Sequence, residues 1–304
     1  MGQIVDEEIS EVVDLILSDY DDDRTVNKID INNQPDKRAI VDVVEKMMKI
    51  LYPGYYSDKV YKIYSLSNNM AATIEDVIFH LKKQIMIVLK YSNREKFVTE
   101  QELEDKAKKI TLEFMRKIPS IREIIETDID AAYEGDPAAD SKDEIIFSYP
   151  GLYAISVYRM AHELQLLSVP MIPRIMTEYA HTVTGIDIHP GAVIGKYFFI
   201  DHGTGIVIGE TTEIGDHVKI YQGVTLGGLS TRGGQKLNEK KRHPTIGNNV
   251  TIYSGASILG GETLIGDDVV VGENTFIVNS VEKGTRVSAK KQELKYSNGI
   301  IEKV

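Results

Sequence analysis

The residues best suited to chemistry stand in two interruptions of an otherwise regular repeat. The first interruption holds Asp201 and His202. The second is the loop 227–245, which contains five basic residues and one acid. Histidine titrates near neutral pH and is therefore suited to take or give a proton in a reaction. The net charge of +4 in the loop favours an anionic ligand, although a solvated surface loop has a similar composition.

The repeat itself is six residues long. Aliphatic residues recur in phase between positions 188 and 277, with longer steps at the interruptions, and glycine follows many of them. Strand alternation has a period of two and does not explain the glycines. A short strand plus a turn does, and three such units form a triangular coil whose aliphatic side chains stack in a column. The aliphatic positions are Ile188, Ile194, Ile200, Ile208, Ile214, Ile220, Leu226, Ile246, Ile252, Ile258, Ile265, Val271 and Ile277.

Glycine separates the repeat from the region before it, since residues 1–180 hold four glycines and residues 181–304 hold twenty. Apolar spacing typical of helices predicts helices at 36–51, 69–91, 99–117, 120–132, 149–167 and 173–183. We expect Thr99 to cap one helix, and Ser120 with Glu123 to form a capping box after Pro119. Residues 1–35 show no firm pattern beyond nine acids among the first 23 positions.

These features predict an α+β protein with four segments. An acidic leader and linker covers 1–35, an α-helical domain 36–183, a β-helix 184–281 with the extruded loop 227–245, and a C-terminal tail 282–304. The net charge of −11 argues against nucleic-acid binding, and no apolar stretch is long enough to span a membrane. The chain has no cysteine and no secretory signal pattern, so we expect a cytoplasmic protein without thiolate chemistry.

Five segments form an ordered series: DPAAD at 136–140, DIHP at 187–190, IDHGTGIVIGET at 200–211, VTLGG at 224–228 and RHP at 242–244. In this order they resemble the serine O-acetyltransferase family of hexapeptide-repeat acyltransferases. The resemblance implies a left-handed parallel β-helix after the helical domain, in a homotrimer or a dimer of trimers. It also implies transfer of acetyl from the co-substrate acetyl-CoA to the hydroxyl of L-serine, for cysteine biosynthesis, with no metal.

The resemblance assigns the catalytic roles to two residues. His202 matches the general base that takes the hydroxyl proton of serine, and Asp187 matches the carboxylate that orients its imidazole, as in the hydrolase triads. The activated hydroxyl would attack the thioester directly, without an acyl-enzyme.

Further matches imply how the substrates bind. The serine ammonium would bind Asp136 and Asp201. The serine carboxylate would bind the planar fork of Arg242, with His243 beside it and Glu210 steadying the guanidinium. We expect CoA at the basic loop and at the turns that contain Gly227, Gly228 and Ser254, because cations and backbone N–H groups attract phosphates.

The chain departs from the family at its C-terminus. The segment 281–290 lacks the usual Gly-x-Pro-Ala-basic pattern, and the chain ends at Val304 instead of the Ile that inserts into the partner sulfhydrylase in many members. This ending argues against a cysteine synthase complex.

Three other functions stay open at this point. A related enzyme could acetylate homoserine, a sugar or an antibiotic. A γ-type carbonic anhydrase would need three zinc-binding histidines, and the His-x4-His pair of that family is absent. A non-catalytic trimeric scaffold would not depend on His202.

Overall fold

The computed structural model describes residues 2–21, 24–27, 34–56, 66–92, 99–230, 232–238 and 240–290. The chain divides into two compact units, Met1–Pro35 and Asp36–Val304. None of the described helices is both long and apolar enough to cross a lipid bilayer. The ending at 300–304, which argues against a cysteine synthase complex, lies outside the described residues.

The first unit contains the helix α1 (Gly2–Asp19). The prediction of no firm pattern here was wrong, because Ile9, Val12, Val13 and Ile16 follow helical spacing and no glycine or proline stands between 3 and 19. The acids between them dilute the apolar signal. The four apolar side chains are each about half exposed.

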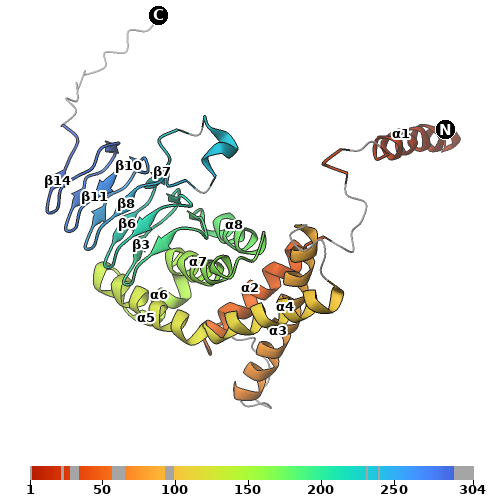
Figure 1. The fold of residues 1–304 in the computed structure, drawn as a ribbon, viewed down its shortest axis with the longest axis horizontal. Coiled ribbons are helices and arrows are strands. Elements are labelled where there is room, and N and C mark those ends of the chain that lie inside the picture. Colours follow the sequence, from red (N-terminus) through yellow and green to blue (C-terminus); the bar gives the residue numbers. More distant parts are fainter. Residues whose placement is uncertain are drawn as a thin grey trace, which may run out of the picture. The chain divides into compact units, whose positions relative to one another are not determined.

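The second unit begins with a helical region (Figure 1). Its helices are α2 (Lys37–Leu51), α3 (Leu66–Tyr91), α4 (Glu100–Arg116), α5 (Ile118–Gly135), α6 (Lys142–Ser148), α7 (Pro150–Leu166) and α8 (Ile172–Thr184). All six predicted helices are confirmed, with ends that differ by up to three residues. The seven-residue α6 is too short to show apolar periodicity, which explains why the sequence did not predict it.

Helix caps follow the sequence in one case and not in another. Thr99 accepts the backbone N–H of Glu102, and the Glu102 carboxylate accepts the backbone N–H of Thr99, so the cap at Thr99 is confirmed as a capping box. The box predicted at Ser120 was wrong. Helix α5 already begins at Ile118 with Pro119 in its first turn, and the Ser120 hydroxyl donates back to the carbonyl of Lys117.

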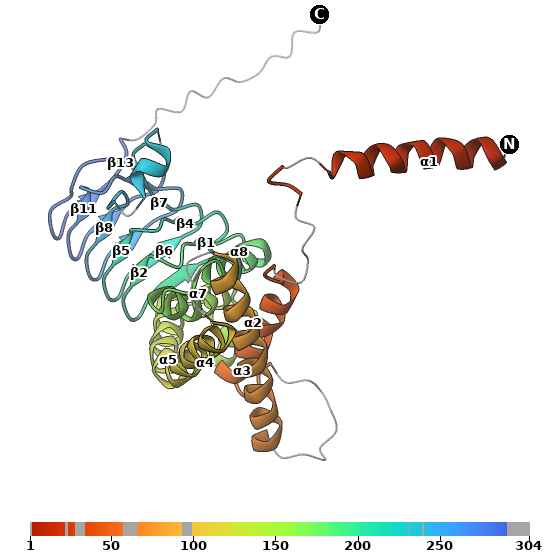
Figure 2. The same cartoon turned by 45° about the vertical axis from the view of Figure 1, so that its right-hand side comes forward.

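A parallel β-helix follows the helices (Figures 1 and 2). Sheet A contains β1, β4, β7, β10 and β13; sheet B contains β2, β5, β8 and β11; and sheet C contains β3, β6, β9, β12 and β14. From β1 to β12, successive strands therefore belong to successive sheets, and each trio closes one triangular coil of the predicted left-handed β-helix. The strands are β1 (Asp187–Ile188), β2 (Val193–Ile194), β3 (Phe199–Asp201), β4 (Val207–Ile208), β5 (Glu213–Ile214), β6 (Lys219–Tyr221), β7 (Thr225–Gly227), β8 (Thr245–Ile246), β9 (Thr251–Ile252), β10 (Ser257–Leu259), β11 (Leu264–Ile265), β12 (Val270–Val271), β13 (Phe276–Ile277) and β14 (Arg286–Val287).

The aliphatic column of the coils is confirmed. Every aliphatic residue of the six-residue repeat is buried, from Ile188 to Ile277. Strand pairing stacks them in register, so that Leu226 lies between Ile208 and Ile258 in sheet A. Burying one such side chain stabilises the fold by about 1.5–3 kcal/mol, which makes the column the main source of stability for the coils.

The extruded loop stands outside the regular coils, whereas the start of the predicted tail extends them. The loop between β7 and β8 contains a short 3₁₀ helix, Gly234–Leu237, with no buried residue, and it projects from the coils in Figure 1. The segment predicted to be a tail contains β14, which pairs with β12 and so continues sheet C. Residues 291–304 lie outside the described part of the chain.

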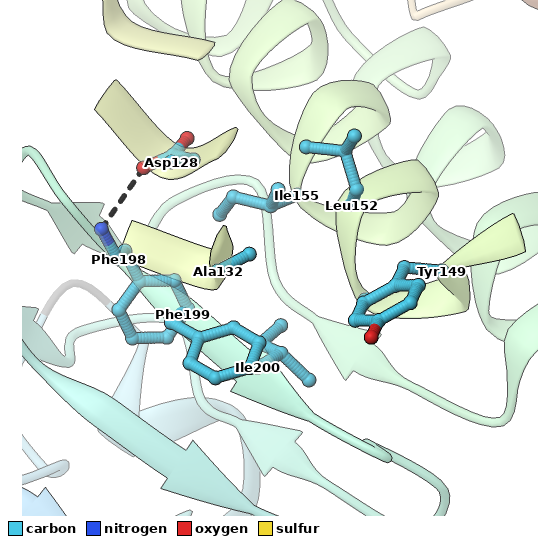
Figure 3. Close-up of a pocket in the computed structure, with 9 residues that line it drawn as sticks. Asp128, Ala132, Tyr149, Leu152, Ile155, Phe198, Phe199 and Ile200 are labelled. Carbon is cyan, nitrogen blue, oxygen red and sulfur yellow. Dashed lines mark hydrogen bonds between the residues drawn. The ribbon is translucent and has the colours of Figure 1, made fainter. Parts of the chain in front are cut away.

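Helices α5 and α7 pack against the first coil and fix its position. Ala132 and Leu152 face Phe199 and Ile200 around a small cavity of about 10 Å³ (Figure 3). Gly151 allows the close approach, because a Cβ there would lie 2.6 Å from the carbonyl oxygen of Ile200.

A buried ion pair ties both helices to the coil. Asp128 of α5 accepts two hydrogen bonds from Arg159 of α7, at 2.6 and 2.8 Å, and one from the backbone N–H of Phe198 at 3.0 Å. Arg159 also donates to the carbonyl oxygens of Ile194 and Gly195. Because each charge is matched and hydrogen-bonded, removing one partner would leave the other charge buried and unpaired.

Candidate active site

The corners of the coils define two edges of sheet A. We name the corner between sheets C and A the C–A edge; it includes residues 202–206, between β3 and β4. We name the corner between sheets A and B the A–B edge; it includes residues 209–212 and the loop 228–244. The predicted site residues are divided between these two edges.

His202 and Asp201 lie at the C–A edge, where β3 ends. The left-handed backbone of His202 (φ 58°) ends the strand, and 74% of its side chain is exposed. Its Nε2 lies 3.8 Å from Oδ1 of Asp201. The arrangement presents an accessible imidazole beside a carboxylate, which suits a general base.

The C-terminal end of α5 brings Asp136 to the same edge. Its carboxylate accepts a hydrogen bond from the Tyr149 hydroxyl at 2.6 Å and one from the backbone N–H of Ala138 at 2.9 Å. These hydrogen bonds hold the pKa of Asp136 below its ordinary value, with smaller contributions from Lys219 and His202. Asp136 is therefore ionised at neutral pH.

Lys219 of β6 joins the two carboxylates of this edge. Its ammonium group lies 3.1 Å from Oδ2 of Asp201 and donates to the carbonyl oxygen of Gly135, next to Asp136, at 2.7 Å. Burial lowers the pKa of Lys219, but hydrogen bonds to Tyr221 and Asp201 outweigh it and raise the pKa above its usual value. One cation thus stands beside two carboxylates, so these three groups keep a net charge of −1, which would attract the ammonium group of a ligand.

Arg242 lies at the A–B edge, with its guanidinium paired to the carboxylate of Glu210. Burial raises the pKa of Glu210, but the hydrogen bond from Arg242 and the nearby His189 outweigh it and hold the pKa below its usual value. Thr211 accepts the backbone N–H groups of Arg242 and His243, at 2.9 and 3.1 Å. The Thr211 hydroxyl therefore anchors the end of the extruded loop to the coil.

His243 is buried beside Arg242. Burial and the Arg242 charge lower the pKa of His243 to about 4, so this imidazole is neutral at physiological pH. Its Nδ1 accepts the backbone N–H of Thr211 at 3.0 Å, which leaves the ring proton on Nε2. Gly209 provides the space, since a Cβ there would lie 2.1 Å from the His243 ring. His243 is therefore a neutral hydrogen-bond donor.

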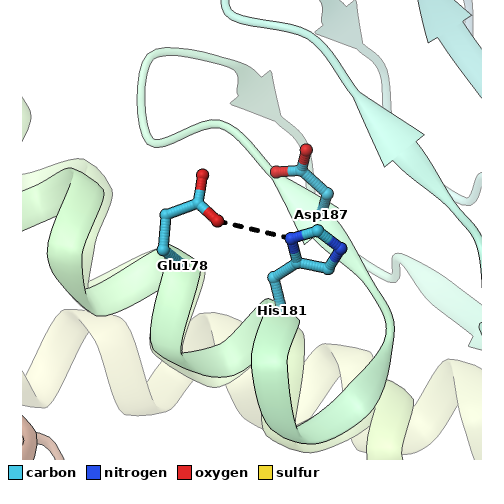
Figure 4. A group of neighbouring side chains, drawn as sticks. All are labelled: Glu178, His181 and Asp187. Carbon is cyan, nitrogen blue, oxygen red and sulfur yellow. Dashed lines mark hydrogen bonds and ion pairs between the residues drawn. The ribbon is translucent and has the colours of Figure 1, made fainter.

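Asp187 opens β1 and makes no hydrogen bond or ion pair to His202 among the residues that the structure describes. Its neighbours are Glu178 and His181 of α8 (Figure 4), and one ligand atom from each of the three residues lies within 4.8 Å of the others. His181 Nδ1 lies 3.3 Å from Glu178 Oε2. This donor set suits a divalent cation, but Arg174 already pairs with Glu178 and supplies a positive charge.

The residues expected at CoA are also divided between the edges. Gly227 ends β7 and Gly228 follows at the A–B edge, whereas Ser254 follows β9 at the C–A edge. In the basic loop, Lys241 pairs with Glu213 at 3.0 Å. Three further cations of the loop are exposed and have no ion pair among the described residues: Arg232, Lys236 and Lys240.

One copy of the chain thus assembles two groups of residues, and three residues in them were missed by the sequence analysis. Thr211 stands inside the matching segment 200–211, which was a usable signal. Tyr149 reaches the site from the N-cap position of α7 and Lys219 from the next coil, and nothing in their local sequence indicates this. The two groups match the two ends of an amino acid: acids at the C–A edge and an arginine at the A–B edge.

Comparisons with known proteins agree with this chemistry. No family model matches the chain. It is 39% identical over 226 residues to the serine acetyltransferase, plasmid, of Synechococcus elongatus, covering 72% of this chain and 71% of that protein. Serine acetyltransferase isoform 3 of Entamoeba histolytica, solved with cysteine, matches with a TM-score of 0.72 and 36% identity over 84% of each chain. A serine acetyltransferase solved with CoA matches with a TM-score of 0.52 and 26% identity, over 81% of this chain and 96% of that one. The chain therefore belongs to the serine acetyltransferase family.

Proposed function

We propose that this protein transfers the acetyl group of acetyl-CoA to the hydroxyl of L-serine, giving O-acetyl-L-serine and CoA, with His202 as the general base. Two arrangements within one copy support the proposal: an acidic edge containing an accessible imidazole, and a second edge containing an arginine held by a carboxylate. Together they match the ammonium, hydroxyl and carboxylate groups of serine.

In the first step, His202 takes the hydroxyl proton while the serine oxygen attacks the thioester carbon. A C–O bond forms as the carbonyl becomes an oxyanion, and the C–S bond then breaks. The departing CoA thiolate receives the proton from the His202 imidazolium. Atoms and charge balance without an acyl-enzyme, and backbone N–H groups at Gly227 and Gly228 are our candidates for stabilising the oxyanion.

Serine binds through its two charged ends. Its ammonium group lies between Asp136 and Asp201, where one negative charge is unbalanced. Its carboxylate accepts two parallel hydrogen bonds from Arg242, and the neutral His243 donates a further one. Glu210 fixes the guanidinium so that little conformational entropy is lost when serine binds.

We infer that each active site is shared between two copies of the chain. His202 and Arg242 lie on opposite edges of sheet A, so the C–A edge of one copy must meet the A–B edge of another before both contact one serine. A ring of three triangular coils satisfies this at three equivalent interfaces, which favours a homotrimer. Asp187 opens β1, a strand of sheet A, and so stands at the C–A edge with His202. We infer that it orients the imidazole at that edge.

CoA carries several phosphate charges. The three exposed cations of the loop, Arg232, Lys236 and Lys240, provide positive charge for them, and Ser254 with Gly227 and Gly228 lines the path to the thioester. Because Ser254 lies at the other edge, this site also draws on two copies.

The experiment is a thiol-release assay with acetyl-CoA and a panel of acceptors: serine, homoserine, a hexose and an aminoglycoside. We expect release with serine far above the others, and a loss of about 10²–10⁴-fold in turnover for His202→Ala with an unchanged oligomeric mass. Equal rates with homoserine or a sugar would favour the alternative acceptors. Near-normal turnover of His202→Ala would contradict the mechanism and favour the scaffold.

A further inference from the structure

A second cavity, separate from the two edges, lies among α2, α6, α7 and α8. Its volume is about 330 Å³, within the range of small-molecule sites. Five aromatic side chains and one carboxylate are among its lining residues: Tyr56, Phe147, Tyr149, Tyr153, Tyr179 and Glu45. Among the residues that the structure describes, no lysine, arginine or histidine lines it.

Glu45 is held in place by two tyrosines. The hydroxyls of Tyr153 and Tyr179 both donate to the same oxygen, Oε1, at 2.9 and 2.6 Å. Within the described residues, no hydrogen bond or ion pair engages the other oxygen, Oε2. The carboxylate is thus rigidly placed, with one acceptor atom still available.

The charge of Glu45 acts on all the tyrosines around it. Burial and the Glu45 charge raise the pKa of Tyr153 and of Tyr56, and the hydrogen bond to Glu45 together with burial raises the pKa of Tyr179. These phenols therefore stay protonated, and the cavity carries a single negative charge. Among the described lining residues, no cationic side chain neutralises this charge.

Aromatic faces and a carboxylate recognise the same kind of ligand. The ring quadrupole attracts a cation placed over its face, and the carboxylate attracts the same charge directly. Metal ions prefer oxygen and nitrogen ligands over ring carbon, so a lining of five rings and one carboxylate favours an organic cation.

We propose that this cavity is a binding site for a small organic ammonium ion, with Glu45 as its counter-ion and the surrounding tyrosines as its walls. The proposal does not depend on the acetyl-transfer mechanism, because its carboxylate, Glu45, belongs to neither edge. Tyr149 is the one shared residue, since its ring lines the cavity and its hydroxyl donates to Asp136.

The test uses choline and its neutral carbon analogue, 3,3-dimethylbutan-1-ol, which has the same shape without the charge. Ligand-observed saturation-transfer NMR on the full-length protein measures both affinities. We expect choline to bind at least tenfold more tightly than the neutral analogue. Saturating L-serine in every sample keeps choline out of the site at Asp136 and Asp201.

Two variants assign the signal to the cavity. Glu45→Gln keeps an acceptor for both tyrosines, so the fold survives, but it removes the charge and should weaken choline binding at least tenfold. Glu113→Gln, an exposed carboxylate on α4, is the matched control and should change nothing. Equal binding of choline and its neutral analogue, or full choline binding by Glu45→Gln, would overturn the proposal whatever the serine activity of the protein.

Discussion

His202 lies at the C–A edge of sheet A and Arg242 at its A–B edge. One copy of the chain therefore presents the proton acceptor and the carboxylate-binding group at the two opposite corners of sheet A. Their separation follows from the coil itself, because His202 comes before a sheet A strand and the Arg242 loop comes after one. The site residues of one copy are therefore two halves, each with its own supporting contacts.

The ion pair between Arg242 and Glu210 predicts a specific effect on serine binding. Glu210→Gln removes the charge that holds the guanidinium, and we expect the KM for serine to rise about tenfold, since hydrogen bonds to charged groups contribute about 1.5–3 kcal/mol. The KM for acetyl-CoA should change little. Glu213→Gln is the control, because Glu213 pairs with Lys241 and not with Arg242. Equal KM changes in the two variants would contradict the role of Glu210.

The buried His243 predicts how stability depends on pH. Its pKa is about 4 in the folded protein and near 6.5 in the unfolded chain, so between these values the unfolded chain binds more protons. Its contribution to stability is complete above pH 6.5 and is lost as the pH falls toward 4. In His243→Asn, an amide oxygen replaces Nδ1 as the acceptor and does not titrate. The thermal midpoint of the variant should fall less between pH 6.5 and 4, and an identical fall would contradict the assignment.

The contact between Gly151 and Ile200 predicts an unusual cost for a helix substitution. Replacing glycine by alanine normally stabilises a helix by about 0.5–1 kcal/mol, but the added Cβ would lie 2.6 Å from the Ile200 carbonyl. We expect Gly151→Ala to destabilise the protein by about 1–3 kcal/mol, measured by chemical denaturation. A stabilised variant would show that α7 can shift away from the first coil.

The coils of the β-helix could be predicted from the sequence because their aliphatic residues recur about every six positions. Each aliphatic from Ile188 to Ile277 faces the same column, so local spacing alone determines the coil. Thr99 and Glu102 likewise signal a helix start locally. Ser120 does not, because Pro119 already lies inside the first turn of α5. Helix α1 went unrecognised because its acids break up a short apolar stripe.

The supporting contacts of the site could not be predicted in this way. Lys219 meets Asp201 only because β6 pairs with β3 in the next coil, and Tyr149 meets Asp136 only because α7 folds back on α5. The position of Asp187 beside His181 instead of His202 depends on how α8 enters the first coil. Such contacts form only when whole helices and strands pack together, so no local sequence pattern predicts them.

The shared site is tested most directly by combining two inactive variants. His202→Ala keeps an intact A–B edge and Arg242→Ala keeps an intact C–A edge, and each alone should have little activity with serine. Co-expression places an intact half from each beside the other at about a quarter of the interfaces of random trimers. We predict recovery of up to about a quarter of the wild-type turnover in the co-expressed mixture. Activity no higher than that of the single variants would contradict an active site built from two copies.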